Sequence, residues 1–281
     1  MYLILSNKLK HKLGFLALIT LMSCSSYRFI KTEYYDDNFN GYKAKPRMVE
    51  TKTYKYLQEN SSNQKDLISV RRKYYDGKGR FVEDSTFRKD GNFTIGSRVE
   101  YLRNGRLHKA THYNKGNSVY NQENFIYSKN LLSSIVDSHD IVHFFYDSEG
   151  RKIKTETVPI DKEKSYRIVK FYDSNSLATK HEYYDDHKLK SVFKYSYNDD
   201  GNQIKQEVYD SNQRLKNYTL REYDNLKNMN FVRSFKIKER DTIVNFVMKF
   251  EYSYDENDNY VTMKLYQNDI PQYFYEYKYN Y

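Results

Sequence analysis

Apolar and polar residues alternate along much of the chain. Three rows place aromatic or aliphatic side chains at nearly every second position: Leu189, Ser191, Phe193, Tyr195 and Tyr197; Phe246, Met248, Phe250, Tyr252 and Tyr254; and Tyr273, Tyr275, Tyr277, Tyr279 and Tyr281. Because successive side chains of a β-strand point to opposite faces, each row predicts one face of a sheet. Helix-like periods are scarce, and residues 130–140 are the one faint example.

Turn-forming residues separate the predicted strands with a recurring plan. A tyrosine is followed by Asp or Asn and then by Gly or Asn, most clearly at residues 75–80, 146–151, 197–202 and 254–259. Partial copies begin at Tyr172, Tyr184, Tyr209 and Tyr223. Asp and Asn side chains fold back onto the backbone of a turn, and Gly or Asn accepts a positive φ there. The plan therefore predicts consecutive strands joined by short turns.

These turns resemble the YD repeats of the RHS family, which read roughly Tyr-x-Tyr-Asp-x-x-Gly-Arg-Leu. The resemblance covers most of residues 70–281, and residues 250–281 match best. Residues 104–107 and 114–116 are also similar to repeats of a MORN-like antitoxin family. The family implies that large RHS proteins wind many repeats into a closed shell. With roughly eight imperfect copies here, we expect an all-β antiparallel meander of hairpins that forms an open, curled single sheet.

The N-terminal residues follow a different pattern. Three lysines among the first 12 residues precede an apolar run from Leu13 to Met22, and Ser23 and Cys24 follow. This order is typical of a secretory signal peptide, and the run is too short to span a bilayer as a helix. Residues 21–24 resemble the lipobox of bacterial lipoproteins, which implies cleavage between Ser23 and Cys24 and acylation of Cys24 by chains such as palmitate.

The chain is therefore expected to have three parts: a lipoprotein signal peptide at residues 1–23, the lipidated Cys24 with a tether at residues 24–46, and a YD-like repeat domain at residues 47–281. Membrane attachment through the N-terminal lipid alone is expected, because no later segment approaches about 20 apolar residues. No acidic cluster follows Cys24. We therefore expect an outer-membrane lipoprotein of the bacterial cell envelope that faces the periplasm.

Composition narrows the function classes. The 281 residues include 32 Tyr, 16 Phe and one Cys, with a formal net charge of +10. A chain this aromatic is expected to fold, and a single Cys excludes an internal disulfide framework or a multi-cysteine metal site. Basic residues alternate with acids, as in Lys205-Gln206-Glu207, which predicts a solvated strand face. We expect no nucleic-acid partner.

Two histidine pairs have the four-residue spacing of a helical zinc site: His108 with His112, and His139 with His143. On a strand, four residues cover about 13 Å, so one metal ion would not bridge either pair. We interpret these residues as surface histidines and expect no metal site.

Acidic residues also gather in predicted turns. Asp255, Asn257 and Asn259 imitate the start of a calcium loop, but Tyr260 occupies the position that requires Gly, so we predict a hairpin turn. The adjacent acids at 185–186 and 199–200 lie in turns rather than on one strand face. With no nucleophile motif in the sequence, we expect a protein that is not an enzyme and uses no cofactor.

Two function classes fit these expectations. The first is a lipid-anchored binding or scaffolding module that contacts a protein or glycan of the envelope through a Tyr-rich sheet. Tyr273, Tyr275, Tyr277 and Tyr279 are its candidate binding surface, because tyrosine offers area and a hydrogen bond at small entropic cost. The alternative is an immunity or antitoxin-type inhibitor of a toxin or secreted effector, which the antitoxin-like repeats suggest.

Overall fold

The computed structural model describes residues 46–57, 64–161, 163, 165–239 and 241–281. Within these ranges the chain forms 18 β-strands. Their bounds are β1 (Met48–Tyr56), β2 (Lys65–Tyr75), β3 (Phe81–Arg88), β4 (Phe93–Tyr101), β5 (Leu107–Tyr113), β6 (Val119–Ser128), β7 (Leu131–Val136), β8 (Asp140–Tyr146), β9 (Lys152–Pro159), β10 (Arg167–Tyr172), β11 (Ala178–Asp185), β12 (Lys188–Tyr197), β13 (Gln203–Asp210), β14 (Leu215–Tyr223), β15 (Met229–Lys238), β16 (Asp241–Tyr254), β17 (Tyr260–Gln267) and β18 (Ile270–Asn280).

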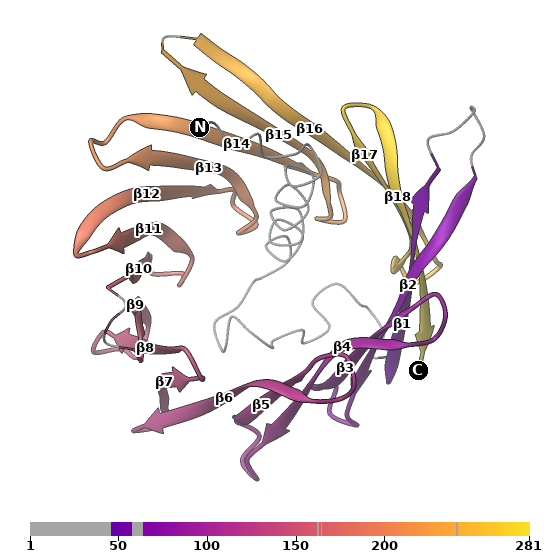
Figure 1. Ribbon diagram of the computed structural model, residues 1–281, viewed down its shortest axis with the longest axis horizontal. Helices are drawn as coiled ribbons and strands as arrows, with labels where there is room; N and C mark the ends of the chain where they lie inside the picture. The colour runs from indigo at the N-terminus through magenta and orange to yellow at the C-terminus, as the bar shows by residue number, and fades with distance from the viewer. Residues whose placement is uncertain (1–45, 58–63, 162, 164, 240) are drawn as a thin grey trace, which may run out of the picture.

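The strands close into a single antiparallel barrel (Figure 1). Each strand pairs with the next one along the chain, and β18 also pairs with β1, so that Thr51 faces Tyr277 and Lys52 faces Glu276. The expectation of an open, curled single sheet is therefore wrong. Closure satisfies the backbone groups of both terminal strands, which an open sheet would leave as unpaired edges.

The turns have the chemistry that the sequence predicts. In the turn after β8, the Asp147 carboxylate accepts hydrogen bonds of 2.9 Å from the backbone amides of Glu149 and Arg151, and Gly150 has a φ of 78°. In five other turns one Asp carboxylate likewise accepts hydrogen bonds from two backbone amides, at Asp76, Asp173, Asp210, Asp224 and Asp255. All of these turns except the one at Asp210 follow an even-numbered strand. We call that end of the barrel the YD rim and the opposite end the far rim.

Residues that face each other on neighbouring strands point to the same side, so the register defines two walls. One wall carries most of the buried apolar side chains, among them Val49, Tyr75, Val99, Ala110, Phe125, Ile135, Val232, Met248 and Leu265. Side chains converge on the concave side of a closed sheet, so this is the inner wall. The buried residues form two clusters, one over β1–β7 and one over β15–β17, and Tyr277 packs against both.

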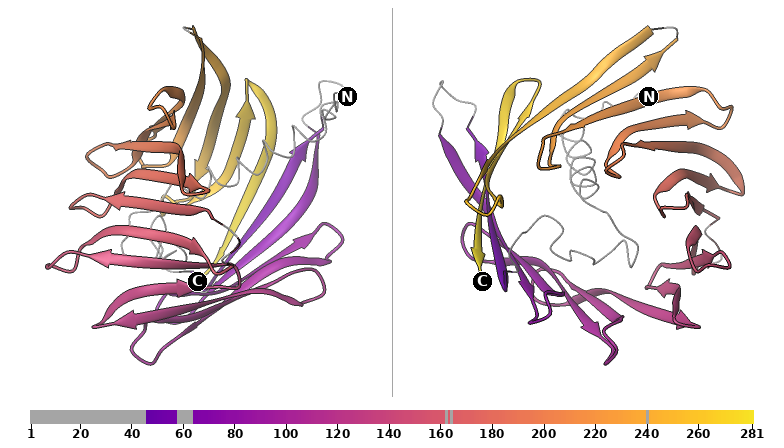
Figure 2. Two further views of the ribbon diagram at one scale, coloured as in Figure 1. Left: turned by 60° about the vertical axis from the view of Figure 1, so that its left-hand side comes forward. Right: turned by 180° about the vertical axis from the view of Figure 1, so that it is seen from behind.

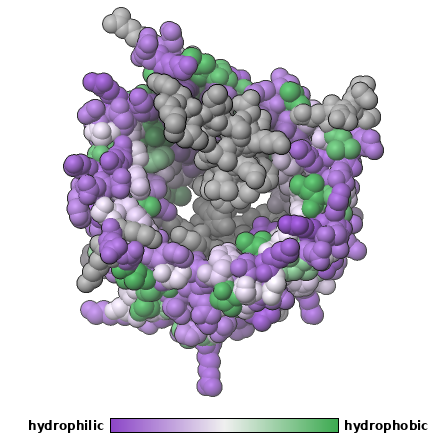
Figure 3. All heavy atoms as spheres, viewed as in Figure 1, coloured by the Kyte–Doolittle hydropathy of each residue, from purple (hydrophilic) through white to green (hydrophobic). Residues whose placement is uncertain are grey.

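The outer wall carries many paired charged side chains, together with a few apolar ones such as Val169 and Val192. Lys154, Lys180, Lys205 and Lys249 each pair at 2.8 to 3.1 Å with the glutamate two positions later on the same strand. Arg72 pairs with Glu50, and Arg98 with Glu83, across neighbouring strands. Figure 3, viewed as in Figure 1, shows a mostly hydrophilic outer margin and an opening near the middle of the ring. The expectation of a solvated strand face is confirmed for these pairs.

Candidate functional site

The predicted tyrosine row lies on the inner wall of β18. Tyr275 faces Met263 and Tyr273 faces Leu265 on β17, and Tyr277 and Tyr279 pack against the inner-wall clusters. Burial raises the pKa of Tyr273, and it raises those of Tyr275 and Tyr277 further. In the isolated chain these side chains therefore fill the core beside β17 and present little free surface.

The other predicted residues fall in several places. Ser23 and Cys24 lie outside the described residues. His108, His139 and His143 are exposed, as expected. The Asp255 segment is a hairpin turn, as the sequence predicts. The described residues contain no group of three or more His, Cys, Asp or Glu side chains arranged to hold a metal ion, and no helix among them is long and apolar enough to cross a membrane.

Among the four predicted histidines, His112 is the exception, and its interpretation as a surface residue is wrong. Its side chain is 13% exposed on the inner wall, where Nδ1 lies 2.9 Å from Ser97 Oγ and Nε2 lies 3.3 Å from Glu123 Oε1. The Ser97 hydroxyl can donate to Nδ1 or accept from it, depending on the tautomer of the ring. Ser97, His112 and Glu123 lie on β4, β5 and β6, which pair with one another. Most described backbone amides of these strands donate hydrogen bonds within the sheet, so they do not form a group of donors that could stabilise an oxyanion.

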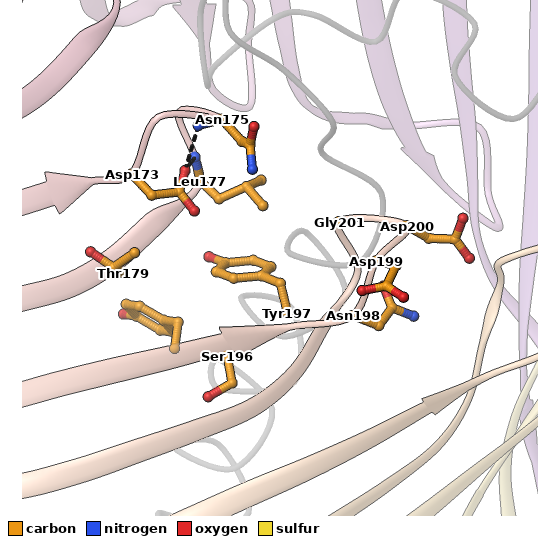
Figure 4. Close-up of a pocket in the computed structure, with 11 residues that line it drawn as sticks. Asp173, Asn175, Leu177, Thr179, Ser196, Tyr197, Asn198, Asp199, Asp200 and Gly201 are labelled. Carbon is orange, nitrogen blue, oxygen red and sulfur yellow. Dashed lines mark hydrogen bonds between the residues drawn. The ribbon is translucent and has the colours of Figure 1, made fainter.

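A pocket of about 710 Å³ opens on the YD rim between two neighbouring turns (Figure 4). The turn after β10 contributes Asp173 and Asn175, and the turn after β12 contributes residues 198–201. Tyr195 and Tyr197 line the space between these turns. Sequence reasoning found both turns but not their pairing, which follows only from the order of strands in the sheet.

Some polar side chains of the pocket are hydrogen-bonded within the protein, and at least one makes no ion pair with a described residue. Asp173 is held by its turn, because its Oδ1 accepts the amides of Asn175 and Leu177 at 2.9 Å. Tyr197 donates a 2.7 Å hydrogen bond to the carbonyl oxygen of Ala178, which fixes its ring. Asp199 is exposed and makes no ion pair with any residue that the structure describes. The pocket thus combines fixed aromatic rings with a carboxylate available to a ligand.

Comparison with known proteins gives no family assignment. No protein-family model matches the chain, and no curated protein matches it. A porin-like protein from Bacteroides uniformis aligns over 84% of this chain and 98% of its own length, with 8% identity and a TM-score of 0.33. For a porin-like protein from Bacteroides vulgatus these values are 82%, 97%, 12% and 0.27. A crystal structure of TcdB2-TccC3 without its hypervariable C-terminal region aligns over 71% of this chain and 12% of its own, with 11% identity and a TM-score of 0.28. These similarities are too low to carry an argument about function.

Proposed function

We propose that this chain is a lipid-anchored protein of the bacterial envelope that acts by binding and not by catalysis. The basic start, the apolar run and the single Cys24 support the anchor. The Asp-capped turns support an origin of the strands in YD-type repeats, because they use the Tyr-Asp positions of that motif. The barrel is then the part of the protein that meets a partner.

The outer wall supports attachment through the lipid rather than insertion of the barrel. Barrels that span a membrane present an apolar band roughly 25 Å tall to lipid. Here the outer wall carries the Lys–Glu pairs of β9, β11, β13 and β16 and the Arg–Glu pairs of β1–β4. Moving such charges into hydrocarbon is unfavourable, which supports a barrel held in water beside the membrane. Its proposed periplasmic position is supported only by the sequence after Cys24, which has no acidic cluster.

The rim pocket is the binding site that the geometry favours, and a glycan is its proposed ligand. The exposed carboxylate of Asp199, which lines the same pocket as Tyr195 and Tyr197, carries this proposal. Sugar rings present C–H faces that pack on aromatic side chains, and their hydroxyl groups donate hydrogen bonds to carboxylates. The volume of about 710 Å³ is within the usual range for small-ligand sites.

Titration calorimetry with soluble peptidoglycan and lipopolysaccharide-core fragments tests the site. Asp199→Asn should weaken binding by about tenfold, which corresponds to loss of one charge-assisted hydrogen bond. Glu256→Gln is the matched control, because Glu256 occupies the same place in the turn after β16, outside the pocket. If no fragment binds, or if both variants weaken binding equally, the pocket is not the glycan site.

Metabolic labelling with an alkyne fatty acid tests the anchor separately. The wild-type chain should be labelled and should sediment with membranes, whereas Cys24→Ser should be unlabelled and released. Acyl chains contribute about 0.8 kcal/mol per buried methylene, so loss of the lipid removes the proposed attachment. Label on the Cys24→Ser chain would contradict the assignment.

A further inference from the structure

Three adjacent hairpins extend from the far rim toward the same side of the molecule: β15–β16, β17–β18 and β1–β2. All three rise toward the top in Figure 1 and in both views of Figure 2, and in Figure 1 β15–β16 leans to the left and β1–β2 to the right. The β15–β16 hairpin extends furthest, because the pairing of β16 with β17 stops at Met248, seven positions after β16 begins at Asp241. Asn268 bonds the backbone of Val247 and marks the level at which β17–β18 ends.

The ends of these hairpins expose aliphatic side chains. Ile243 and Val244 are 45% and 52% exposed on β16, Ile270 is 51% exposed at the start of β18, and Leu57 is 43% exposed just after β1. Leu57 lies close to Ile270 in the sheet, because it is two positions beyond Lys55, which pairs with Tyr273. We call these four residues the tip surface.

The position of Ile243 and Val244 is informative. Consecutive strand residues point to opposite faces, so a hairpin that packs on one wall exposes only one of two such residues. Here both are exposed, and the facing residues Lys236 and Phe235 belong to the same hairpin. A hairpin end that exposes an aliphatic side chain on each face, beside polar neighbours such as Thr242 and Asn245, suits a boundary that surrounds it rather than a flat protein surface.

We propose that the tip surface inserts into the headgroup boundary of the membrane that carries the Cys24 lipid. This inference rests on the proposed lipid anchor. The 21 residues from 25 to 45 lie between Cys24 and Pro46 and can span at most about 75 Å. β1, which runs from near Pro46 toward Leu57 of the tip surface, is only about 30 Å long. The anchor therefore keeps the tip surface within reach of the bilayer at high effective concentration.

The side chains beside the tips favour apolar insertion over charge attraction. In the sequence, Lys236, Lys238 and Arg240 are interleaved with Glu239 and Asp241, so the net charge of this segment is only +1. An electrostatic contact with anionic lipid would require an excess of basic residues. The expected contact therefore depends on the aliphatic side chains and varies little with salt.

The chain contains no Trp, so a single introduced indole reports on its own surroundings. We would place Val244→Trp in an unlipidated Cys24→Ser chain that lacks the signal peptide, and add vesicles of phosphatidylethanolamine with a minor share of phosphatidylglycerol. The emission should shift to shorter wavelength, and brominated acyl chains should quench it. Leu226→Trp is the matched control, because Leu226 is also 43% exposed but lies in a turn of the YD rim.

A second variant separates insertion from folding defects. In an Ile270→Trp chain, adding Ile243→Asn and Val244→Asn should lower vesicle binding by about tenfold while the melting temperature stays unchanged. The proposal is overturned if Val244→Trp does not respond to vesicles, or if Leu226→Trp responds equally. It is also overturned if the Val244→Trp shift follows protein concentration without vesicles, because the tip surface then contacts a second copy. The Cys24→Ser background keeps these outcomes independent of lipidation.

Discussion

The hydroxyl of Tyr279 donates a 2.7 Å hydrogen bond to the carbonyl oxygen of Tyr260 and ties the end of β18 to the start of β17. Five other tyrosines near the ends of even-numbered strands make the same bond to the preceding strand: Tyr101, Tyr146, Tyr197, Tyr223 and Tyr252. On these six strands a tyrosine therefore links neighbouring strands in addition to its apolar contacts. This role gives a structural reason for the tyrosine directly before the turns at Asp147, Asn198 and Asp224.

Replacement of Tyr279 by Phe removes this bond and keeps the ring. We expect the free energy of unfolding to fall by about 1 kcal/mol in urea titrations, because the Tyr260 carbonyl loses its side-chain partner. Tyr120→Phe is the control, since the Tyr120 ring is about half exposed and its hydroxyl has no hydrogen bond to a described residue. Equal effects of the two substitutions would show that the bond adds nothing to stability.

Gly96 on β4 faces Ser85 on β3. A Cβ atom at this position would come within 2.6 Å of the Asp84 carbonyl oxygen and 3.1 Å of the Phe93 ring. Gly96→Ala should therefore lower stability by about 1 to 3 kcal/mol, because the backbone of β3 must move. Gly77→Ala, where nothing lies within 4 Å of the added atom, should be neutral or slightly stabilising. Thermal unfolding of both variants checks this contrast, and a neutral Gly96→Ala would contradict the close approach.

The Asp carboxylates in the turns make the stability of the fold depend on pH in the acidic range. The Arg151 amide is the largest cause that lowers the pKa of Asp147, and the Arg214 amide has the same effect on Asp210. A folded-state pKa below the ordinary 3.8 means that the stabilisation is present above about pH 4 and is lost as pH falls through the folded-state value.

Asp147→Asn should therefore reduce the loss of stability between about pH 4 and pH 2, since the amide oxygen still accepts a hydrogen bond but no longer titrates. Chemical denaturation across this pH range measures the slope. Glu256→Gln removes an exposed turn acid that accepts no hydrogen bond from a described residue, and it serves as the control. An unchanged slope for Asp147→Asn would argue against the role of this carboxylate.

Local structure could be predicted from the sequence because its signals are local. The alternation from Tyr273 to Tyr281 correctly predicted a strand, which is β18, and Asn268 and Asp269 form the turn before it with φ values of 50° and 64°. The faint helical period at residues 130–140 was misleading, since the segment contains β7. Leu132 and Ile135 both face the inner wall three positions apart because a register irregularity interrupts the strict alternation beside Tyr127.

Closure and the rim pocket could not be predicted in the same way. β1 pairs with β18 across more than 200 intervening residues, and no turn sequence marks that contact. Residues 48–55 also lack the Tyr-Asp motif, so a count of repeats did not include the strand that completes the barrel. The buried position of His112 likewise depends on Ser97 and Glu123 from neighbouring strands.

Closure is the central claim, and a disulfide between β1 and β18 tests it most directly. The Cys24→Ser chain is free of cysteine, so Lys52→Cys with Glu276→Cys places a single pair on facing outer-wall positions. Ser253→Cys with Thr262→Cys, which face each other on β16 and β17, is the positive control, and Lys52→Cys with Lys205→Cys on β13 is the negative control. The closed barrel predicts that mild oxidation links the two cysteines introduced on β1 and β18 within one chain as readily as the positive control, as a shift in gel mobility reversed by reductant. An open sheet would leave the β1–β18 pair unlinked, like the negative control, while the positive control still forms.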